Sequence, residues 1–258
     1  MTYDYNYFMK EVYRLTGIDL TSYKENQMKR RIDALITKHK IGDYKNYVDI
    51  LEKDKDMLNE FVEYITINVS EFYRNPEQWK ILSERVFPEL IEANNKKPLK
   101  IWSAACSTGD EPYSLVMCLS KLMPINQIKI IATDISNEII DKAKIGIYGE
   151  KSLAGVPADL KAKYFTQNGG FYSISDEIKS RVEFRKQNLL KDDYLKDCDL
   201  IVCRNVLIYF TEEAKSQVIR KYYQALKPGG VLFIGSTEQI IDYKEIGYKR
   251  IDSFFYQK

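Results

Sequence analysis

The sequence predicts an α/β protein in which a mostly parallel sheet follows a helical N-terminal domain. After Pro98, short runs rich in β-branched residues alternate with helical stretches, and such alternation is typical of βαβ units. Residues 1–65 show helical periodicity without a strand signal. Residues 248–257 alternate between apolar and polar side chains, which indicates a last, antiparallel strand.

The N-terminal residues are expected to form four helices. The first ends at Gly17, and its apolar side chains recur at helical spacing: Phe8, Val12 and Leu15. A second helix is expected over residues 23–40, and a third and a fourth over residues 43–65. In the α/β part, strands are expected at 99–103, 129–133, 182–185, 200–203 and 231–235, with helices beginning at Pro112, Asn137 and Thr211.

This pattern divides the chain into segments. A helical domain is expected over residues 1–66, a linker with a first helix over 67–97, and the sheet-forming domain over 98–258. Residues 149–181 interrupt the alternation and are expected to form a small antiparallel subdomain. Within it, residues 165–172 read as a tight hairpin, because the Asn168–Gly169 pair would supply a positive φ at the turn.

Composition excludes several classes of protein. With 39 Lys and Arg against 37 Asp and Glu, the net charge of +2 is too small to indicate nucleic acid or a membrane surface. No apolar run approaches the roughly 18 residues of a membrane span, and residues 1–10 lack the apolar centre of a signal peptide. A cytoplasmic protein is expected. One histidine, His39, and four cysteines without CxxC spacing argue against a metal site and against a histidine-dependent nucleophile.

Charge is unevenly distributed in the helical domain. Residues 21–40 carry six Lys and Arg against two acids, a balance of +4, whereas residues 41–65 carry seven acids against three lysines, a balance of −4. An ordinary solvated helix face explains this pattern. The alternative is a docking surface for an acidic partner, because a one-sided field steers association.

The first strand-to-helix turn points to a cationic ligand. In an open parallel sheet, ligands bind outside the carboxyl ends of the strands. The turn over residues 103–112 reads SAACSTGDEP, with small residues and the acidic pair Asp110 and Glu111. It is not the GxGxxG turn of dinucleotide binders, and acids at the start of a helix repel phosphate. A ligand with positive charge and no phosphate fits better.

Asp134 extends this interpretation. It ends the second expected strand, where a carboxylate can accept hydrogen bonds from a ribose diol. A helix N-cap is the alternative role, although Ser136 is equally placed for it. Together with the acidic first turn, Asp134 indicates a nucleoside attached to a cation, which is S-adenosylmethionine.

Two further segments stand out. Residues 203–210 follow the fourth strand, where Asn205 is expected to face the cofactor and Tyr209 to lie at the rim; the alternative is a strand running into a buried apolar loop. The Asn/Asp-Pro-Pro-aromatic run of amine methyltransferases is missing there, which disfavours DNA or an amine as substrate. Residues 66–75 concentrate polar and aromatic side chains where a plain linker would be rich in Gly and Ser, with a structural helix cap as the alternative.

Five strings of the sequence resemble, in order and spacing, the chemotaxis receptor methyltransferases of the CheR family. They lie at residues 66–74, 101–114, 132–136, 203–210 and 235–238. The resemblance extends over nearly the whole chain. It implies a class I S-adenosylmethionine-dependent methyltransferase fold, a Rossmann-like and mostly parallel sheet with an antiparallel last strand. An all-α N-terminal domain and a small inserted antiparallel β-subdomain would accompany that sheet.

The resemblance also implies an activity and a partner. The activity is that of a protein-glutamate O-methyltransferase, which uses S-adenosyl-L-methionine to form glutamyl methyl esters on methyl-accepting chemotaxis receptors. S-adenosyl-L-homocysteine is then the second product, and sensory adaptation in chemotaxis is the purpose. The implied partner is the cytoplasmic helical domain of these receptors, which would bind to the basic helix 23–40. Nucleic acid, direct membrane insertion and oligomerisation are not expected.

The positions of the matching motifs assign the family's site residues to residues of this chain. The cofactor-binding residues would be Asn68, Ser70, Arg74, Glu111, Asp134, Asn188, Leu189, Asn205 and Val206. Arg74 and Tyr209 would border the transferred methyl group as catalytic residues, and no metal is implied. Ser70 stands where family members commonly have Thr, and Tyr73 where they have Phe; both changes keep the chemistry.

A glutamate substrate explains the missing base. A glutamate side chain has an ordinary pKa near 4.3, so it is already a nucleophile at pH 7. Catalysis would depend on orientation, with Arg74 pairing with the incoming carboxylate and Tyr209 donating a hydrogen bond. Two alternatives stay open. One is a class I methyltransferase acting on a small molecule or another protein, and the other is a non-catalytic module that senses the cofactor.

Overall fold

The chain forms two compact units, which are described separately. A computed structural model describes residues 4–67 and 69–258. One unit comprises residues 1–68 together with 209–216, and the other comprises residues 69–208 together with 217–258. The domain boundaries expected from the sequence, after residues 66 and 97 and around 149–181, remain predictions.

The first unit is a helical bundle, as the sequence predicts. Its elements are α1 (Tyr5–Thr16), η1 (Leu20–Ser22), α2 (Glu25–Lys38), α3 (Tyr44–Lys53) and α4 (Lys55–Thr66). Gly17 ends α1 in the left-handed conformation with a φ of 73°. The core of this unit is aromatic, because the buried Phe8 ring stacks on Tyr47 and meets Phe61 edge-on.

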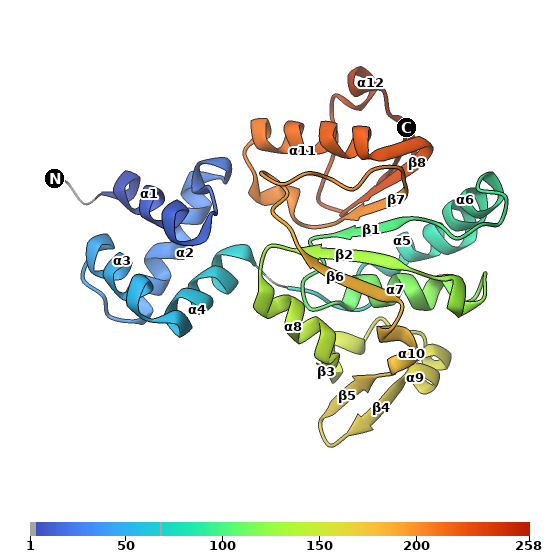
Figure 1. Ribbon diagram of the computed structural model, residues 1–258, viewed down its shortest axis with the longest axis horizontal. Helices are drawn as coiled ribbons and strands as arrows, with labels where there is room; N and C mark the ends of the chain where they lie inside the picture. Colours follow the sequence, from blue (N-terminus) through green and yellow to red (C-terminus); the bar gives the residue numbers. More distant parts are fainter. Residues whose placement is uncertain (1–3, 68) are drawn as a thin grey trace. The chain divides into compact units, whose positions relative to one another are not determined.

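The second unit is built on a sheet that has seven strands within the described residues, in the order β6-β2-β1-β7-β8-β10-β9 (Figure 1). They are β1 (Ile101–Ala104), β2 (Ile130–Asp134), β6 (Val182–Lys186), β7 (Cys198–Cys203), β8 (Leu226–Ile234), β9 (Lys249–Asp252) and β10 (Phe255–Gln257). Strands β6, β2, β1, β7 and β8 are parallel, and β10 is antiparallel to its neighbours β8 and β9. The parallel sheet with an antiparallel end is confirmed. The tail, however, is a hairpin of two short strands, so the prediction of one strand there was wrong.

The strand order reverses between β1 and β7. From β1 the chain moves outward to β2 and β6, and from β7 it moves to β8 on the other side. Helix α11 (Glu212–Ala225) accordingly lies across the sheet from α7 (Asp110–Leu119) and α8 (Asn137–Ile145) (Figure 1). A crevice outside the carboxyl ends of the strands at such a reversal is the usual ligand site of open α/β sheets.

The remaining helices complete this unit. A run of α5 (Pro76–Ile81), the π-helical turn η2 (Leu82–Val86) and α6 (Phe87–Ala93) leads to β1, and its buried side chains join the same core as α7. The short elements of this unit are η3 (Ile125–Gln127) and α12 (Tyr243–Ile246), and η5 (Leu207–Tyr209) runs from this unit into the helical one. Within residues 4–67 and 69–258, no helix combines the length and apolarity needed to cross a membrane.

The insertion forms a second, antiparallel sheet in the order β3-β5-β4. Its elements are β3 (Ile147–Gly149), η4 (Glu150–Leu153), α9 (Ala158–Tyr164), β4 (Phe165–Asn168), β5 (Phe171–Ile174) and α10 (Asp176–Lys179). The predicted hairpin is present, but Asn168 pairs with Phe171 as part of the strand, and the positive φ falls on Gly169. The turn is therefore Gly169–Gly170 rather than Asn168–Gly169, which removes any strain from the asparagine.

Candidate cofactor site

The carboxyl ends of the parallel strands bring together most of the residues that the sequence singled out. Eight of the predicted site residues belong to the unit of residues 69–208 and 217–258: Ser70, Arg74, Glu111, Asp134, Asn188, Leu189, Asn205 and Val206. Asn68 lies outside the described residues. Tyr209 belongs to the helical unit.

Asp134 ties the first two loops together. Its Oδ2 accepts a hydrogen bond from the Ser107 N–H at 2.9 Å, and its Oδ1 accepts one from the Ser136 N–H at 3.2 Å. Burial raises the pKa of Asp134, and these backbone hydrogen bonds partly offset that rise. The cap of α8 is Ser136, whose hydroxyl accepts from the Ile139 N–H, so the helix-cap role considered for Asp134 does not apply.

The first loop bends sharply over the edge of the sheet. Ala105, Ser107 and Gly109 have φ values of 68°, 48° and 89°. A Cβ at Gly109 would lie 2.9 Å from a ring carbon of Tyr113 and 3.0 Å from the Cβ of Ala143, so only glycine fits there. Helix α7 starts directly afterwards at Asp110; the expected start at Pro112 was two residues late.

Glu111 is the acid of this site that retains solvent access. Its Oε1 accepts from the Ser103 hydroxyl at 2.8 Å, and its Oε2 lies 3.7 Å from Nη1 of Arg204. The Glu111 side chain is 12% exposed, against 3% for Arg204. Burial raises the pKa of Glu111 to about 7, while the charges of Arg204 and, more weakly, Arg74 oppose the rise. A ligand cation at Oε2 would favour the ionised form further.

Arg204 is a site residue that the sequence analysis missed. It is buried, and its Nη2 donates to the carbonyl of Arg74, to Oε1 of Gln78 and to Oδ1 of Asn75, at 2.6, 2.9 and 3.1 Å. Burial lowers its pKa, which the charge of Glu111 opposes. A buried cation requires such compensation, so Arg204 joins residues 74–78 to the end of β7. An arginine directly after six buried strand residues was the signal available in the sequence.

The segment 69–75 is packed tightly against the rest of the sheet-forming unit. The ring of Phe72 contacts those of Tyr148 and Phe165 edge-on, at 4.8 and 5.2 Å between centroids. Tyr73 has a φ of 52°, and its N–H donates to the Ser114 hydroxyl at 3.1 Å. Asn75 precedes α5 without a side-chain cap hydrogen bond, which disfavours the helix-cap interpretation of this segment.

Arg74 lies near the end of this segment. Its Nη1 donates to the carbonyl of Val69 at 3.1 Å, and its own carbonyl also accepts from the indole N–H of Trp79 at 3.0 Å. The side chain is half-buried. Its backbone is therefore fixed from two directions, while the guanidinium retains donors for a ligand.

The loop after β6 brings an amide to the same edge. Asn188 Oδ1 accepts from the Leu190 N–H at 3.0 Å, which forms an Asx turn. Leu189 is buried beside it. The preceding Gln187 donates its N–H to the carbonyl of Asp134 at 2.8 Å, so this loop lies beside the end of β2.

Glu238, after β8, is a second site residue that the sequence analysis gave no role. It is buried, and its two oxygens accept hydrogen bonds from the backbone at the end of β7. Asn205, the first residue of that turn, has a φ of 61°. The predicted cofactor residues Asn205 and Val206 thus lie on a turn whose backbone N–H groups donate to the Glu238 carboxylate.

Tyr209 ends the turn η5 and is packed within the helical unit. Its carbonyl accepts from the Lys24 N–H at 2.9 Å. The next residue, Phe210, pairs with Tyr23 through a backbone bridge and a ring contact at 5.1 Å. The expected pairing of Tyr209 with Arg74 across the transferred methyl group remains a prediction.

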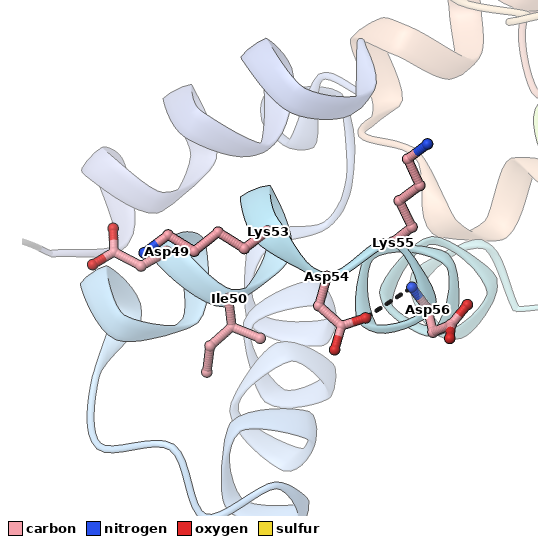
Figure 2. Close-up of a pocket in the computed structure, with 6 residues that line it drawn as sticks. All are labelled: Asp49, Ile50, Lys53, Asp54, Lys55 and Asp56. Atoms are coloured by element: carbon pink, nitrogen blue, oxygen red, sulfur yellow. Dashed lines mark hydrogen bonds between the residues drawn. The ribbon is translucent and has the colours of Figure 1, made fainter.

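A surface hollow lies elsewhere, where α3 meets α4 in the helical unit (Figure 2). Its volume is about 500 Å³, and it is lined by Asp49, Ile50, Lys53, Asp54, Lys55 and Asp56. Asp54 caps α4 by accepting from the Asp56 N–H at 2.9 Å, and Asp49 pairs with Lys45 at 2.7 Å. The described residues predicted for the site do not line this hollow, and the carboxylates of Asp49 and Asp54 have structural partners.

The carboxyl edge of the sheet fits S-adenosylmethionine. Glu111 offers an acceptor to a cation. Asp134 accepts from three backbone N–H groups, and a carboxylate has about four acceptor positions, so one remains for a hydroxyl group. In the described part of the chain, no cluster of three or more His, Cys, Asp or Glu residues could hold a metal ion.

Comparison with known proteins gives two family matches. The family described as "CheR methyltransferase, SAM binding domain" matches residues 68–252, and the one described as "CheR methyltransferase, all-alpha domain" matches residues 3–66.

Curated relatives match over almost the whole chain. A "Chemotaxis protein methyltransferase" of Listeria innocua is 44% identical over 255 residues, which cover 99% of this chain and 97% of that protein. "Chemotaxis protein methyltransferase 1" of Pseudomonas aeruginosa is 36% identical over 248 residues, covering 92% and 90%. Among solved structures, an O-methyltransferase family protein from Burkholderia thailandensis has a TM-score of 0.39 and 19% identity, covering 71% of this chain and 42% of that one.

Proposed function

Because the chain belongs to the CheR methyltransferase family, with the family's S-adenosylmethionine-binding domain, we propose that it methylates glutamate side chains of methyl-accepting chemotaxis receptors. The products are a glutamyl methyl ester and S-adenosyl-L-homocysteine, and the purpose is sensory adaptation. The names of the curated relatives support the chemotaxis role.

One observation of the site carries the glutamate assignment. Arg74 presents a guanidinium close enough to Glu111 for its charge to lower the pKa of that acid, and Arg204 fixes the Arg74 backbone. An arginine held at the site of the cofactor can pair with an incoming carboxylate. A protonated amine would be repelled by the Arg74 guanidinium. To become a nucleophile, it would also need a base to take its proton.

The mechanism requires orientation more than proton transfer. When bound, the cofactor supplies a methyl group attached to a positively charged sulfur. The receptor carboxylate is ionised at pH 7, so its oxygen forms the new bond to carbon without a general base, and its negative charge is lost in the ester. Orientation of this kind contributes up to roughly 7–11 kcal/mol. Arg74 aligns the carboxylate, and Tyr209 donates a hydrogen bond to it.

Residues from five loops would hold the cofactor. Glu111 would accept from its cationic part and Asp134 from its ribose hydroxyls. The other proposed contacts are Asn68, Ser70, Arg74, Asn188, Leu189, Asn205 and Val206. Arg74 must bind the substrate carboxylate only moderately, because its partner's charge is absent in the product.

The receptor would dock on the helical unit. Helix α2 and its flanks expose Lys24, Lys29, Arg30, Lys38 and Lys40, and this positive field suits an acidic helical partner. We propose a monomer that meets the cytoplasmic helices of the receptor through this face.

Tandem mass spectrometry tests the substrate assignment. The purified protein is incubated with S-adenosylmethionine and a chemoreceptor cytoplasmic fragment, and methylated positions are mapped in the digested fragment. We expect methyl groups on glutamate side chains alone. Methylation of lysine or arginine, or of a small molecule with the receptor unmodified, would instead support a different class I methyltransferase.

A further inference from the structure

Glu238 gathers backbone N–H groups from two loops, and the described residues supply four of them. Its Oε1 accepts from Val206 and Leu207 at 2.9 and 2.7 Å, and its Oε2 accepts from Asn205 and Gly235 at 3.0 and 2.7 Å. Glu238 is only 2% exposed. Three successive N–H groups that converge on one anion form a backbone nest, here filled by the protein's own carboxylate.

This arrangement leaves Glu238 no capacity for direct chemistry. A carboxylate has about four lone-pair positions, and each of its oxygens already takes two donors. Glu238 therefore has no acceptor to offer a ligand. Whatever it contributes to the site must act through the turn at residues 205–207.

The turn needs such an anchor. Asn205 adopts a φ of 61°, which is uncommon for a residue with a Cβ. The backbone also approaches Gly235 closely, since a Cβ there would lie 2.7 Å from the Asn205 nitrogen and 2.8 Å from Oε2 of Glu238. Without the carboxylate, buried N–H groups of the turn would lose their partner, which is costly.

We propose that Glu238 is a positioning residue that holds Asn205 and Val206 in the conformation that binds the cofactor. This inference rests on the proposed function, in which both residues contact S-adenosylmethionine. Because the N–H groups of residues 205–207 point to Glu238, the turn can offer a ligand only acceptor oxygens and the Asn205 amide. It therefore suits the amino and hydroxyl groups of the cofactor.

Glu238→Gln is the sharpest test, because it keeps the shape and replaces one acceptor oxygen with an NH₂ group. Two of the four N–H groups would then face a donor. We expect the Kd for S-adenosylmethionine, measured by calorimetry on the full chain, to rise by about tenfold or more. Glu238→Asp keeps both oxygens on a shorter stem and should give an intermediate Kd.

Asp199→Asn is the matched control. Asp199 is also a buried carboxylate in this unit, and it accepts from the Lys100 N–H and from Lys227 Nζ, both at 2.7 Å, near the amino end of β7. We expect this control to lower the Tm, as Glu238→Gln does, while its Kd stays within twofold of wild type.

Two results would overturn the inference: a wild-type Kd in Glu238→Gln, or an equal loss of affinity in Asp199→Asn. If Glu238→Gln does not fold, Glu238→Asp decides by the same criterion. The proposed function is judged separately by methyl transfer to the receptor. A wild-type protein that binds the cofactor but does not methylate receptors would contradict only that function, and the Kd difference would still support the inference.

Discussion

Individual charges at the carboxyl edge of the sheet are buried and paired. Glu111 lies beside Arg204, Arg204 holds the Arg74 segment, and Glu238 takes backbone donors. Removal of any one of these charged side chains therefore leaves a buried partner without a compensating charge or hydrogen bond. Arg74 and Glu111 combine charge with access to solvent, which makes them residues to test for contact with substrate and cofactor.

Replacement of Arg74 by alanine should lower methyl transfer by about 100-fold or more and leave the fold intact. The reason is the loss of carboxylate alignment, to which reaction rates are steeply sensitive. Arg85→Ala is the matched control, because Arg85 is an exposed arginine of the same unit that pairs with Glu89. Initial rates with a receptor fragment, and circular dichroism of both variants, give the comparison. Wild-type rates in Arg74→Ala would rule out its catalytic role.

Glu111 should make stability depend on pH in an unusual direction. Burial raises its pKa from 4.5 to about 7, so the folded protein binds this proton more tightly than the unfolded chain does. The free energy of unfolding should therefore fall as the pH rises from 4.5 through 7, by about 3 kcal/mol at most.

Denaturant unfolding of wild type and Glu111→Gln at several pH values measures this contribution. The difference between the two curves isolates Glu111 from other groups. We expect wild type to lose stability relative to Glu111→Gln as the pH rises from about 4.5 through 7. Parallel curves would show that the Glu111 carboxyl has an ordinary pKa.

Whether a site residue could be predicted from the sequence depends on the range of its interactions. The sequence analysis singled out Glu111, Asp134 and Asn205 because polar residues in the loops that follow predicted strands lie at the ligand-binding edge of open α/β sheets. Arg204 and Glu238 were missed because their partners are remote in sequence. Arg204 donates to Arg74, and Glu238 accepts from Asn205; neither pairing leaves a periodic pattern.

At the scale of elements, the parallel sheet followed from alternation alone, whereas ends and turns did not. Helix α7 starts at Asp110 because Gly109 supplies the left-handed turn before it. The C-terminal tail folds into β9 and β10 as a hairpin, so that β10 can pair with β8. Such details depend on tertiary pairing, which overrides local preference.

Arg204 joins two of these elements, the segment 69–75 and strand β7. Its removal in Arg204→Ala leaves Glu111 without its ion-pair partner and the carbonyl of Arg74 without this donor. We expect a loss of about 3–5 kcal/mol in the free energy of unfolding. Arg204→Lys keeps the charge but loses the planar fork and should fall between alanine and wild type.

Denaturant unfolding monitored by tryptophan fluorescence provides the measurement, because Trp79 and Trp102 lie in the unit that contains Arg204. A loss below about 1 kcal/mol in Arg204→Ala would mean that this buried cation does not join the two elements as described.

At the scale of the whole molecule, the helical unit and the sheet-forming unit divide the work that we propose. The sheet-forming unit contains eight of the residues proposed to bind the cofactor, and the helical unit carries an exposed basic surface at α2. The opposite charge balances of residues 21–40 and 41–65 could be read from the sequence. The pairing of Tyr209 with Arg74 could not be derived from local sequence pattern, because the two residues are remote in sequence and belong to different units.

Charge reversal on α2 should weaken receptor methylation without affecting the cofactor. We expect Lys24→Glu combined with Arg30→Glu to lower kcat/KM for the receptor about tenfold at low salt, and less at high salt, because surface fields are screened. The Kd for S-adenosylmethionine should not change.

Lys53→Glu combined with Lys55→Glu is the matched control, since it makes the same charge change at the hollow between α3 and α4. It should leave kcat/KM for the receptor near wild type. Equal losses in both double variants would mean that net charge, rather than the α2 surface, governs docking.

The central claim is that this chain forms glutamyl methyl esters on chemoreceptors. The most direct test uses S-adenosylmethionine labelled in its methyl group, the purified protein and a receptor cytoplasmic fragment. We expect label in the receptor band that mild base releases as methanol, because esters hydrolyse under these conditions and N-methyl groups do not. Label that resists base, or a receptor that stays unlabelled while the protein binds the cofactor, would contradict the claim.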